Sequence, residues 1–133
     1  MNHDSSVWEG RLDHERLDAY RVAIELDQLV TSTARRVSRG HGWLCDQASR
    51  ASGSMVLNLA EGVGREGADR ARCLRISRGS ALEVDAALAL LANRNQLTSE
   101  VRAHARTLAG RLTAMLTRLI KDANTPRTSP PSS

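Results

Sequence analysis

The sequence predicts an all-α fold, an up-down-up-down antiparallel four-helix bundle, and three observations support it. The chain has 133 residues, the size of one ordinary domain. Aromatic residues make up only 2% of it and Phe is absent, so the core must be aliphatic, which suits packed helices better than strands. Apolar residues recur at alternating steps of three and four along four segments, the spacing of one helix face. Connections of about four to seven residues then require neighbouring helices to run antiparallel.

The first two helices are predicted over residues 14–37 and 44–61. The seam of the first helix, meaning its core-facing positions, contains Ala19, Ala23, Leu26, Val30, Thr33 and Val37. The seam of the second contains Leu44, Ala48, Ala51, Met55 and Asn58. Glycines end both helices, at Gly40 and Gly42 after the first and at Gly62 and Gly64 after the second.

The third helix is predicted over residues 68–91, and the fourth from a cap at Thr98 or Ser99 to about residue 123. The seam of the third contains Cys73, Ile76, Ser80, Val84, Ala87 and Leu91. The seam of the fourth contains Val101, Ala105, Leu108, Leu112, Met115 and Leu119. The bundle therefore spans residues 13–123. Residues 1–12 are polar without a period and residues 124–133 are rich in Pro and Ser, so both are predicted to be disordered tails.

The third helix carries apolar residues outside its seam. These are Leu74, Ala81, Leu82, Leu88 and Leu90. A helix that is apolar on most sides must be buried on more than one side, and a single four-helix bundle covers only part of it. We therefore expect the protein to self-associate, with Leu74, Leu82 and Leu90 contributing to the contact.

Two segments carry a resemblance to a known family. Residues 47–62 (QASRASGSMVLNLAEG) and 74–83 (LRISRGSALE) resemble the paired motifs Q-x-x-R-A-x-x-S-x-x-x-N-x-A-E-G and F-L-x-I-A-x-G-S-x-x-E of the four-helix-bundle family of 23S rRNA intervening-sequence proteins. Leu17, Tyr20, Ala23 and Leu26 fit the family's L-x-x-W-x-x-A-x-x-L opening. The resemblance covers about residues 16–121.

The resemblance implies a homo-oligomer, a pentamer, that is not an enzyme. The family is related to the accessory variability protein of diversity-generating retroelements, a basic pentamer that associates with a reverse transcriptase and nucleic acid. By resemblance, the partners expected here are further copies of the chain, RNA or DNA, or a reverse transcriptase-like protein. The chain departs from the motifs at Ser77, where the family has Ala, at Cys73, where it has Phe, and at Gly42-Trp43-Leu44 before the second helix.

The motif residues also have a physical interpretation. Antiparallel pairing through the turn at residues 62–67 sets Gln47 level with about Leu82 and Asn58 level with about Ala71. Two polar layers follow, one beside Gln47 and one beside the turn, where Arg65, Arg70 and Arg72 are candidate partners. The predicted structural polar core is Gln47, Asn58, Glu61, Ser80 and Glu83. Buried groups of this kind persist when they are hydrogen-bonded; the alternative is a ligand pocket or an active site.

Several kinds of site lack support in the sequence. A di-metal bundle site uses Glu-x-x-His pairs, and no acid here is followed by His three residues later. Of the four histidines, His3 is in the tail, His14 is the first residue of a predicted helix, His41 is in a loop and only His104 lies inside a helix. Cys45 and Cys73 lack zinc spacing and a neighbouring His. The glycines after the second helix lack the Gly-Lys-Ser/Thr of a phosphate loop. We expect no metal, no cofactor and no enzymatic activity.

Positive charge is the remaining candidate for chemistry. The chain has a formal net charge of +4, and the predicted topology draws five arginines to one end of the bundle, opposed by Asp46 and Glu100. This basic rim consists of Arg35, Arg36, Arg39, Arg94 and Arg102. These side chains either complement helix ends and stay solvated or bind phosphates. With three aromatic residues in the chain, base stacking is scarce, so binding would address the backbone with little sequence preference.

The leading hypothesis is a non-enzymatic homo-oligomeric adaptor that binds nucleic-acid backbone, or a nucleic-acid enzyme, through the basic rim. The alternative is a pure protein-interaction or structural oligomer. A third reading is an enzyme or small-ligand binder that uses Asn58 with Glu61 and Gln47 with Glu83. No segment approaches the roughly 18 consecutive apolar residues of a membrane span, and the N-terminus lacks a secretory signal, so a bacterial-type cytoplasmic protein without membrane contact is expected.

Overall fold

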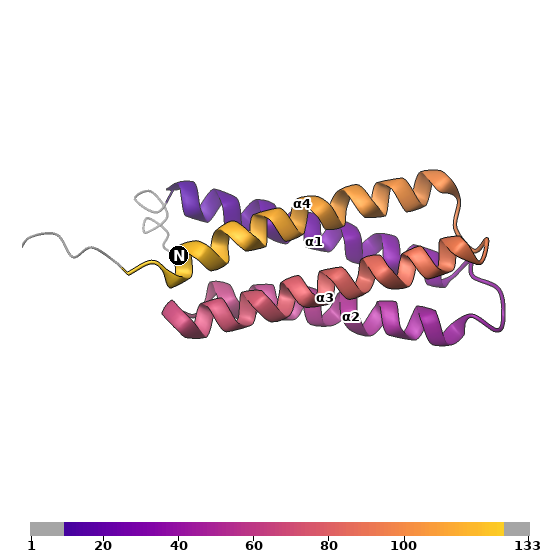
Figure 1. Ribbon diagram of the computed structural model, residues 1–133, viewed down its shortest axis with the longest axis horizontal. Coiled ribbons are helices and arrows are strands. Elements are labelled where there is room, and N and C mark those ends of the chain that lie inside the picture. Colours follow the sequence, from indigo (N-terminus) through magenta and orange to yellow (C-terminus); the bar gives the residue numbers. More distant parts are fainter. Residues whose placement is uncertain (1–9, 127–133) are drawn as a thin grey trace, which may run out of the picture.

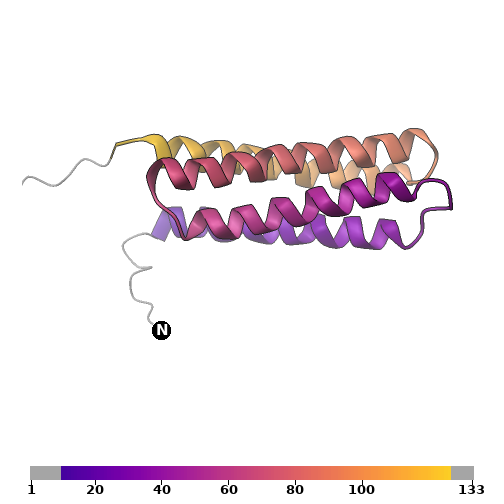
Figure 2. The same ribbon diagram turned by 90° about the horizontal axis from the view of Figure 1, so that it is seen from below.

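The computed structural model describes residues 10–126, which form four long α-helices. These are α1 (Gly10–Ala34), α2 (Gly42–Val63), α3 (Gly67–Asn93) and α4 (Ser99–Asn124). They lie alongside one another in a bundle (Figures 1 and 2). The loops after α1 and α3 lie at one end of it and the α2–α3 turn lies at the other (Figure 1). The prediction of an all-α bundle is confirmed. None of the helices described here has an apolar stretch sufficient to cross a membrane.

The helix ends follow local chemistry. Thr98 is the N-cap of α4, where its side chain accepts a hydrogen bond from the backbone N–H of Val101 at 3.1 Å. Gly40 adopts φ +97°, in the left-handed region that favours glycine, inside the α1–α2 loop. The first helix begins earlier than predicted, so residues 10–12 are helical rather than part of a tail. Residues 1–9 and 127–133 of the predicted tails lie outside the described part of the chain.

The core is aliphatic, and most of the predicted seam positions are buried in it. All predicted seam residues of α1 from Ala19 to Thr33 are buried, as are those of α4 from Ala105 to Leu119. The prediction is wrong at Ile76, which is 40% exposed, while the next residue, Ser77, is fully buried. The seam of α3 is therefore displaced by one position there, because the Ser77 hydroxyl donates a hydrogen bond to the Met55 carbonyl at 2.7 Å and faces α2.

The off-seam apolar residues of α3 fall into two groups. This helix packs against both α2 and α4, so its buried surface is wider than a single seam and includes Leu74, Ala81 and Leu88. The prediction that Leu74 contributes to an oligomer contact is therefore wrong, because its side chain is only 2% exposed within one bundle. Leu82 and Leu90 stay on the outside, 57% and 44% exposed.

Candidate nucleic-acid interface

Four members of the basic rim are exposed at the end of the bundle that carries the α1–α2 and α3–α4 loops. Arg35, Arg36 and Arg39 follow the last residue of α1, and Arg94 is the C-cap of α3. The Arg94 backbone N–H donates to the Leu90 and Leu91 carbonyls, which fixes the residue at the helix end. The helix termini thus bring together arginines that are far apart in the sequence.

The fifth member, Arg102, does not share this exposure. Its Nη1 lies 2.6 Å from Oδ1 of Asp85 across the α3–α4 interface, and the two side chains are 21% and 30% exposed. A charge paired in this way is largely neutralised and braces the two helices. Arg102 therefore belongs to the α3–α4 contact rather than to the open surface of the rim.

The acids at the same end leave the exposed rim arginines free. Asp46 and Glu100 are both exposed, and within residues 10–126 neither forms an ion pair with Arg35, Arg36 or Arg39. The positive charge of the rim is therefore not cancelled by close neighbours.

An aromatic residue that the sequence analysis did not assign to the rim lies against it. The guanidinium carbon of Arg94 sits 5.3 Å from the ring centroid of Trp43, within cation–π range, and Trp43 is 54% exposed. The sequence does contain a signal for this placement. Trp43 lies in the first turn of α2, directly after Gly42, and that turn is at the same end of the bundle as Arg94. The rim therefore offers one exposed ring beside its charges.

Gln96 connects the α3–α4 loop to the α1–α2 loop by hydrogen bonds. Its Oε1 accepts hydrogen bonds from the backbone N–H of Ser38 at 3.0 Å and from the Ser38 hydroxyl at 2.8 Å. Its own backbone N–H donates to the Leu91 carbonyl at 2.9 Å. The preceding residue, Asn95, adopts φ +59°, a left-handed conformation that Asn tolerates better than most residues. These bonds hold the rim arginines on a defined scaffold.

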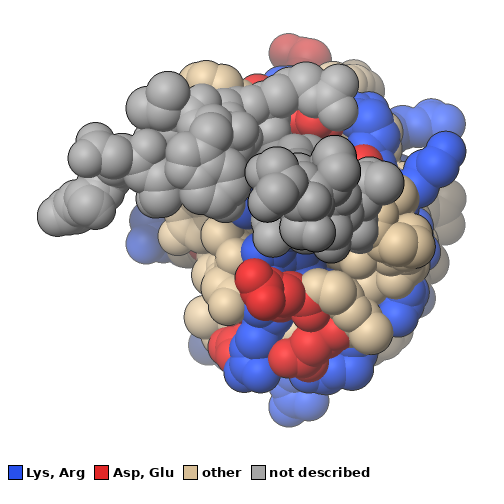
Figure 3. Space-filling model, turned by 90° about the vertical axis from the view of Figure 1, so that its left-hand side faces the viewer, with Lys and Arg blue, Asp and Glu red and all other residues tan. Residues whose placement is uncertain are grey.

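The opposite end of the bundle mixes its charges. Arg65 bridges Glu61 and Asp69, and Arg72 reaches the same Asp69 at 3.3 Å. Hydrogen bonds from Arg65 and then Arg72 lower the pKa of Asp69, and hydrogen bonds to Glu61 and Asp69 raise the pKa of Arg65. Acidic and basic side chains lie side by side on the uncovered part of this end (Figure 3). No field of one sign gathers on that part of the described surface.

The predicted polar core is only partly buried. Ser80 is 4% exposed and donates to the Ser54 hydroxyl at 2.9 Å, and half-buried Asn58 donates to the Ser54 carbonyl and hydroxyl at 3.0 and 3.2 Å. Gln47, Glu61 and Glu83 are exposed, so their predicted burial is wrong. The offset of α3 along α2 differs from the predicted one.

Ser80 lies opposite Ser54, two helical turns from Gln47 along α2, so Gln47 and Ser80 do not meet. The turn between α2 and α3 occupies residues 64–66. Glu61 pairs with Arg65, one of its predicted candidate partners, but does so at the surface. Two buried contacts were not anticipated: Ser77 to the Met55 carbonyl, and Ser52 to Oδ1 of Asp27 at 2.6 Å.

Groups suited to metal binding or nucleophilic chemistry are not assembled in the described residues. No cluster of three or more His, Cys, Asp or Glu side chains there could hold a metal ion. His104 faces Glu25 with 3.1 Å between Nε2 and Oε2. Cys45 and Cys73 are buried, and burial, followed by the negative charge of Asp46, raises the pKa of the Cys45 thiol, which disfavours the nucleophilic thiolate.

The described chain is a small helical-bundle protein with hydroxyl groups in its α2–α3 interface and exposed arginines at one end. The family described as 23S rRNA-intervening sequence protein matches residues 15–118, most of the chain, and the chain belongs to that family. No match was found among curated proteins. The family motif residues Ser54, Asn58 and Ser80 are those that hydrogen-bond between or along α2 and α3.

Proposed function

We propose that this protein is a non-enzymatic, homo-oligomeric adaptor that binds nucleic-acid backbone through the exposed arginines of its basic rim. The observation that supports the proposal is the group formed by Arg35, Arg36 and Arg39, exposed at one end and without acidic partners in the described chain. Phosphate contacts by such side chains release counterions and give salt-sensitive affinity with little sequence preference. Trp43 beside Arg94 adds one surface on which an unpaired base can stack.

The proposal includes a pentamer, an up-down-up-down topology within each copy and a contact made by Leu82 and Leu90. Both leucines are exposed on α3, and Leu57 of α2 is 70% exposed; large apolar side chains in water favour association. Repeating the rim around a ring would multiply its potential beyond that of a +4 chain. By family relationship, a reverse transcriptase-like enzyme is the protein partner that we propose for the same rim. The cytoplasmic location expected from the sequence stays a prediction.

The test is a fluorescence anisotropy titration of RNA and DNA at several salt concentrations. Each phosphate contact contributes roughly −0.9 to the log–log slope of affinity against salt on duplex DNA. Changing Arg35, Arg36 and Arg39 together to Gln removes three candidate contacts, so the slope should become less steep by about two to three units. Base sequence should have little effect.

The matched control changes Arg75, Arg106 and Arg111 to Gln. These three are exposed on α3 and α4 away from the loops of the rim, and the change in net charge is the same. The control variant should keep most of the wild-type slope. Equal slopes for the two triple variants, or no binding by the wild type at low salt, would overturn the proposal and favour the second candidate.

That second candidate is a protein-interaction or structural oligomer without a nucleic-acid role. The exposed leucines of α2 and α3 favour it, because apolar side chains are buried by contact with another protein surface and not by contact with a nucleic-acid backbone. It predicts an oligomer that forms normally and shows no salt-dependent binding to RNA or DNA.

A further inference from the structure

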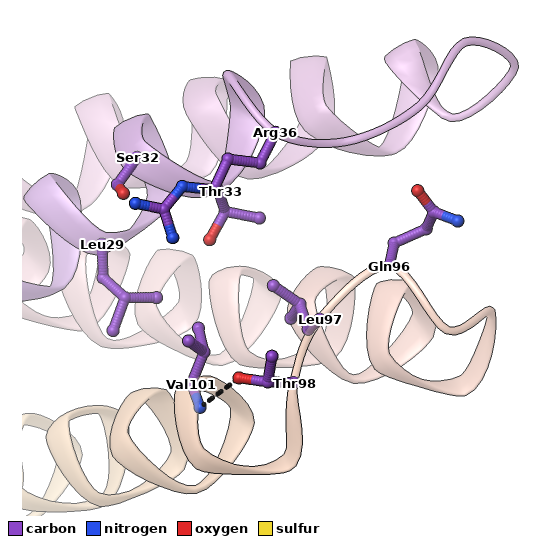
Figure 4. Close-up of a pocket in the computed structure, with 8 residues that line it drawn as sticks. All are labelled: Leu29, Ser32, Thr33, Arg36, Gln96, Leu97, Thr98 and Val101. Atoms are coloured by element: carbon purple, nitrogen blue, oxygen red, sulfur yellow. Dashed lines mark hydrogen bonds between the residues drawn. The ribbon is translucent and has the colours of Figure 1, made fainter.

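A pocket of about 270 Å³ lies where the end of α1 faces the α3–α4 loop and the first turn of α4 (Figure 4). Its wall is apolar on one side, where Leu29, Leu97 and Val101 contribute aliphatic side chains. Ser32, Thr33 and Arg36 from α1 and the segment that follows it provide polar groups, and no Asp or Glu lines the pocket. An amphipathic cavity with donors and without carboxylates is suited to an amphipathic anion.

Thr33 provides a neutral hydrogen-bond donor to the pocket. The residue is only 6% exposed, and its hydroxyl points into the pocket (Figure 4). Thr31, Thr113 and Thr117 all donate their hydroxyls to carbonyls of their own helices. Within residues 10–126 the Thr33 hydroxyl has no hydrogen-bond partner. Among the described residues the buried side-chain polar atom without a partner is Nδ1 of His41, so the Thr33 hydroxyl is open to the pocket and is available to a molecule bound there.

Arg36 supplies the charge. Its guanidinium folds back towards Ser32 and Thr33 over the pocket (Figure 4), and it has no acidic partner in the described part of the chain. Two other side chains that border the pocket already have hydrogen bonds: Gln96 Oε1 accepts from Ser38, and the Thr98 hydroxyl oxygen accepts from the N–H of Val101. The free donors of the described lining are therefore the Arg36 guanidinium and the hydroxyls of Ser32 and Thr33.

We propose that this pocket binds a small amphipathic carboxylate. The carboxylate accepts hydrogen bonds from the Arg36 guanidinium and the Thr33 hydroxyl, and a short hydrocarbon part lies against Leu29, Leu97 and Val101. The volume is at the lower limit of small-molecule sites, which limits the ligand to roughly ten non-hydrogen atoms. The site is separate from the proposed nucleic-acid function, although Arg36 contributes to both.

The experiment uses the full chain labelled with ¹⁵N and titrated with hexanoate, with hexanamide and inorganic phosphate as probes that each lack one half of the ligand. Hexanoate should shift the amide resonances of Leu29, Leu97 and Val101 in a saturable way. Hexanamide, which lacks the charge, and phosphate, which lacks the hydrocarbon, should each bind at least about tenfold more weakly. Equal affinity for hexanoate and phosphate would overturn the proposal, because the apolar wall would then have no role.

Three variants localise the binding. Arg36→Gln should weaken hexanoate binding by about tenfold or more, whereas Arg35→Gln, an exposed neighbour that does not line the pocket, should leave it unchanged. Thr33→Val keeps the shape and removes the hydroxyl, so it should weaken hexanoate binding about fivefold, because one hydrogen bond to the carboxylate is lost. Unchanged binding in Arg36→Gln, or in Thr33→Val, would overturn the assignment.

Discussion

Buried hydroxyl groups specify how the helices of this bundle meet. Ser52, Ser77 and Ser80 are nearly or fully buried, and each has a partner on a neighbouring helix. Because a buried hydroxyl without a partner is costly, each bond penalises a shift of one helix along the next. The family motif positions Ser54 and Ser80 therefore have a structural role in the α2–α3 contact. Ser77, where the family motif has Ala, adds a further bond of the same kind.

The Asp69 carboxylate gives a prediction on pH dependence. Its pKa is lowered by hydrogen bonds from Arg65 and Arg72 in the folded state, so its stabilising effect is present above its unfolded pKa of about 3.9 and is lost as pH falls through the lower folded value. Asp69→Asn should therefore melt at a lower temperature than the wild type at pH 6. At pH 2 the two proteins should melt at nearly the same temperature. The difference at pH 6 should be small, because the pair is exposed.

Thermal melts by circular dichroism at the two pH values measure this effect. Arg65→Gln is a second probe, since it removes the principal partner of Asp69. A difference between wild type and Asp69→Asn that grows as the pH falls would contradict the assignment.

At the scale of elements, α2 and α3 approach each other closely at Gly62, near their shared turn. A Cβ added at Gly62 would lie 3.0 Å from Cδ2 of Leu74 and 3.2 Å from Cβ of Cys73. Gly62→Ala should therefore destabilise the protein by about 1 kcal/mol, because overpacking outweighs the better helix propensity of Ala. Chemical denaturation of the purified variant measures this free energy of unfolding.

Gly53 provides the matched control on the same helix. A Cβ there would meet nothing within 4 Å, so Gly53→Ala should stabilise the protein by about 0.5–1 kcal/mol through helix propensity alone. Equal effects of the two substitutions would show that the helices do not approach closely at Gly62.

At the scale of the whole molecule, the surface of the bundle retains large apolar side chains that one copy does not cover. If Leu82 and Leu90 lie in a contact between copies, changing both to Glu should dissociate the assembly, because each buried carboxylate would be unpaired. The wild type should scatter light with a mass several times the 14.5 kDa of one chain, five times for a pentamer. The double variant should scatter near the mass of one chain while keeping its helical circular dichroism.

Glu83→Gln serves as the comparison, since this neighbouring exposed residue changes charge without adding an apolar-to-charged substitution. It should leave the mass unchanged. A wild-type mass near 14.5 kDa at micromolar concentration would remove the basis for a contact at Leu82 and Leu90.

The sequence by itself determined the four helices, most of their buried positions and the family. Periodicity and capping are local properties: the spacing of Ala19, Leu26 and Thr33 defines a helix face wherever that helix packs. The Thr98 cap needs only the next three residues. The arginines that follow α1 could likewise be placed at a helix end from their position in the chain.

Only the tertiary structure decided which partners meet across helices, because these contacts join residues far apart in the sequence. The register that pairs Ser80 with Ser54 leaves Gln47 and Glu83 in solvent, and a shift of one helix along the other changes no local signal. Leu74 is covered and Leu82 is not because α3 packs on α2 and α4 together. The Thr33 hydroxyl, predicted as part of a seam, borders a pocket because the α3–α4 loop lies opposite it. Each of these outcomes depends on how the helices lie against one another, a property that the periodicity of a single helix does not contain.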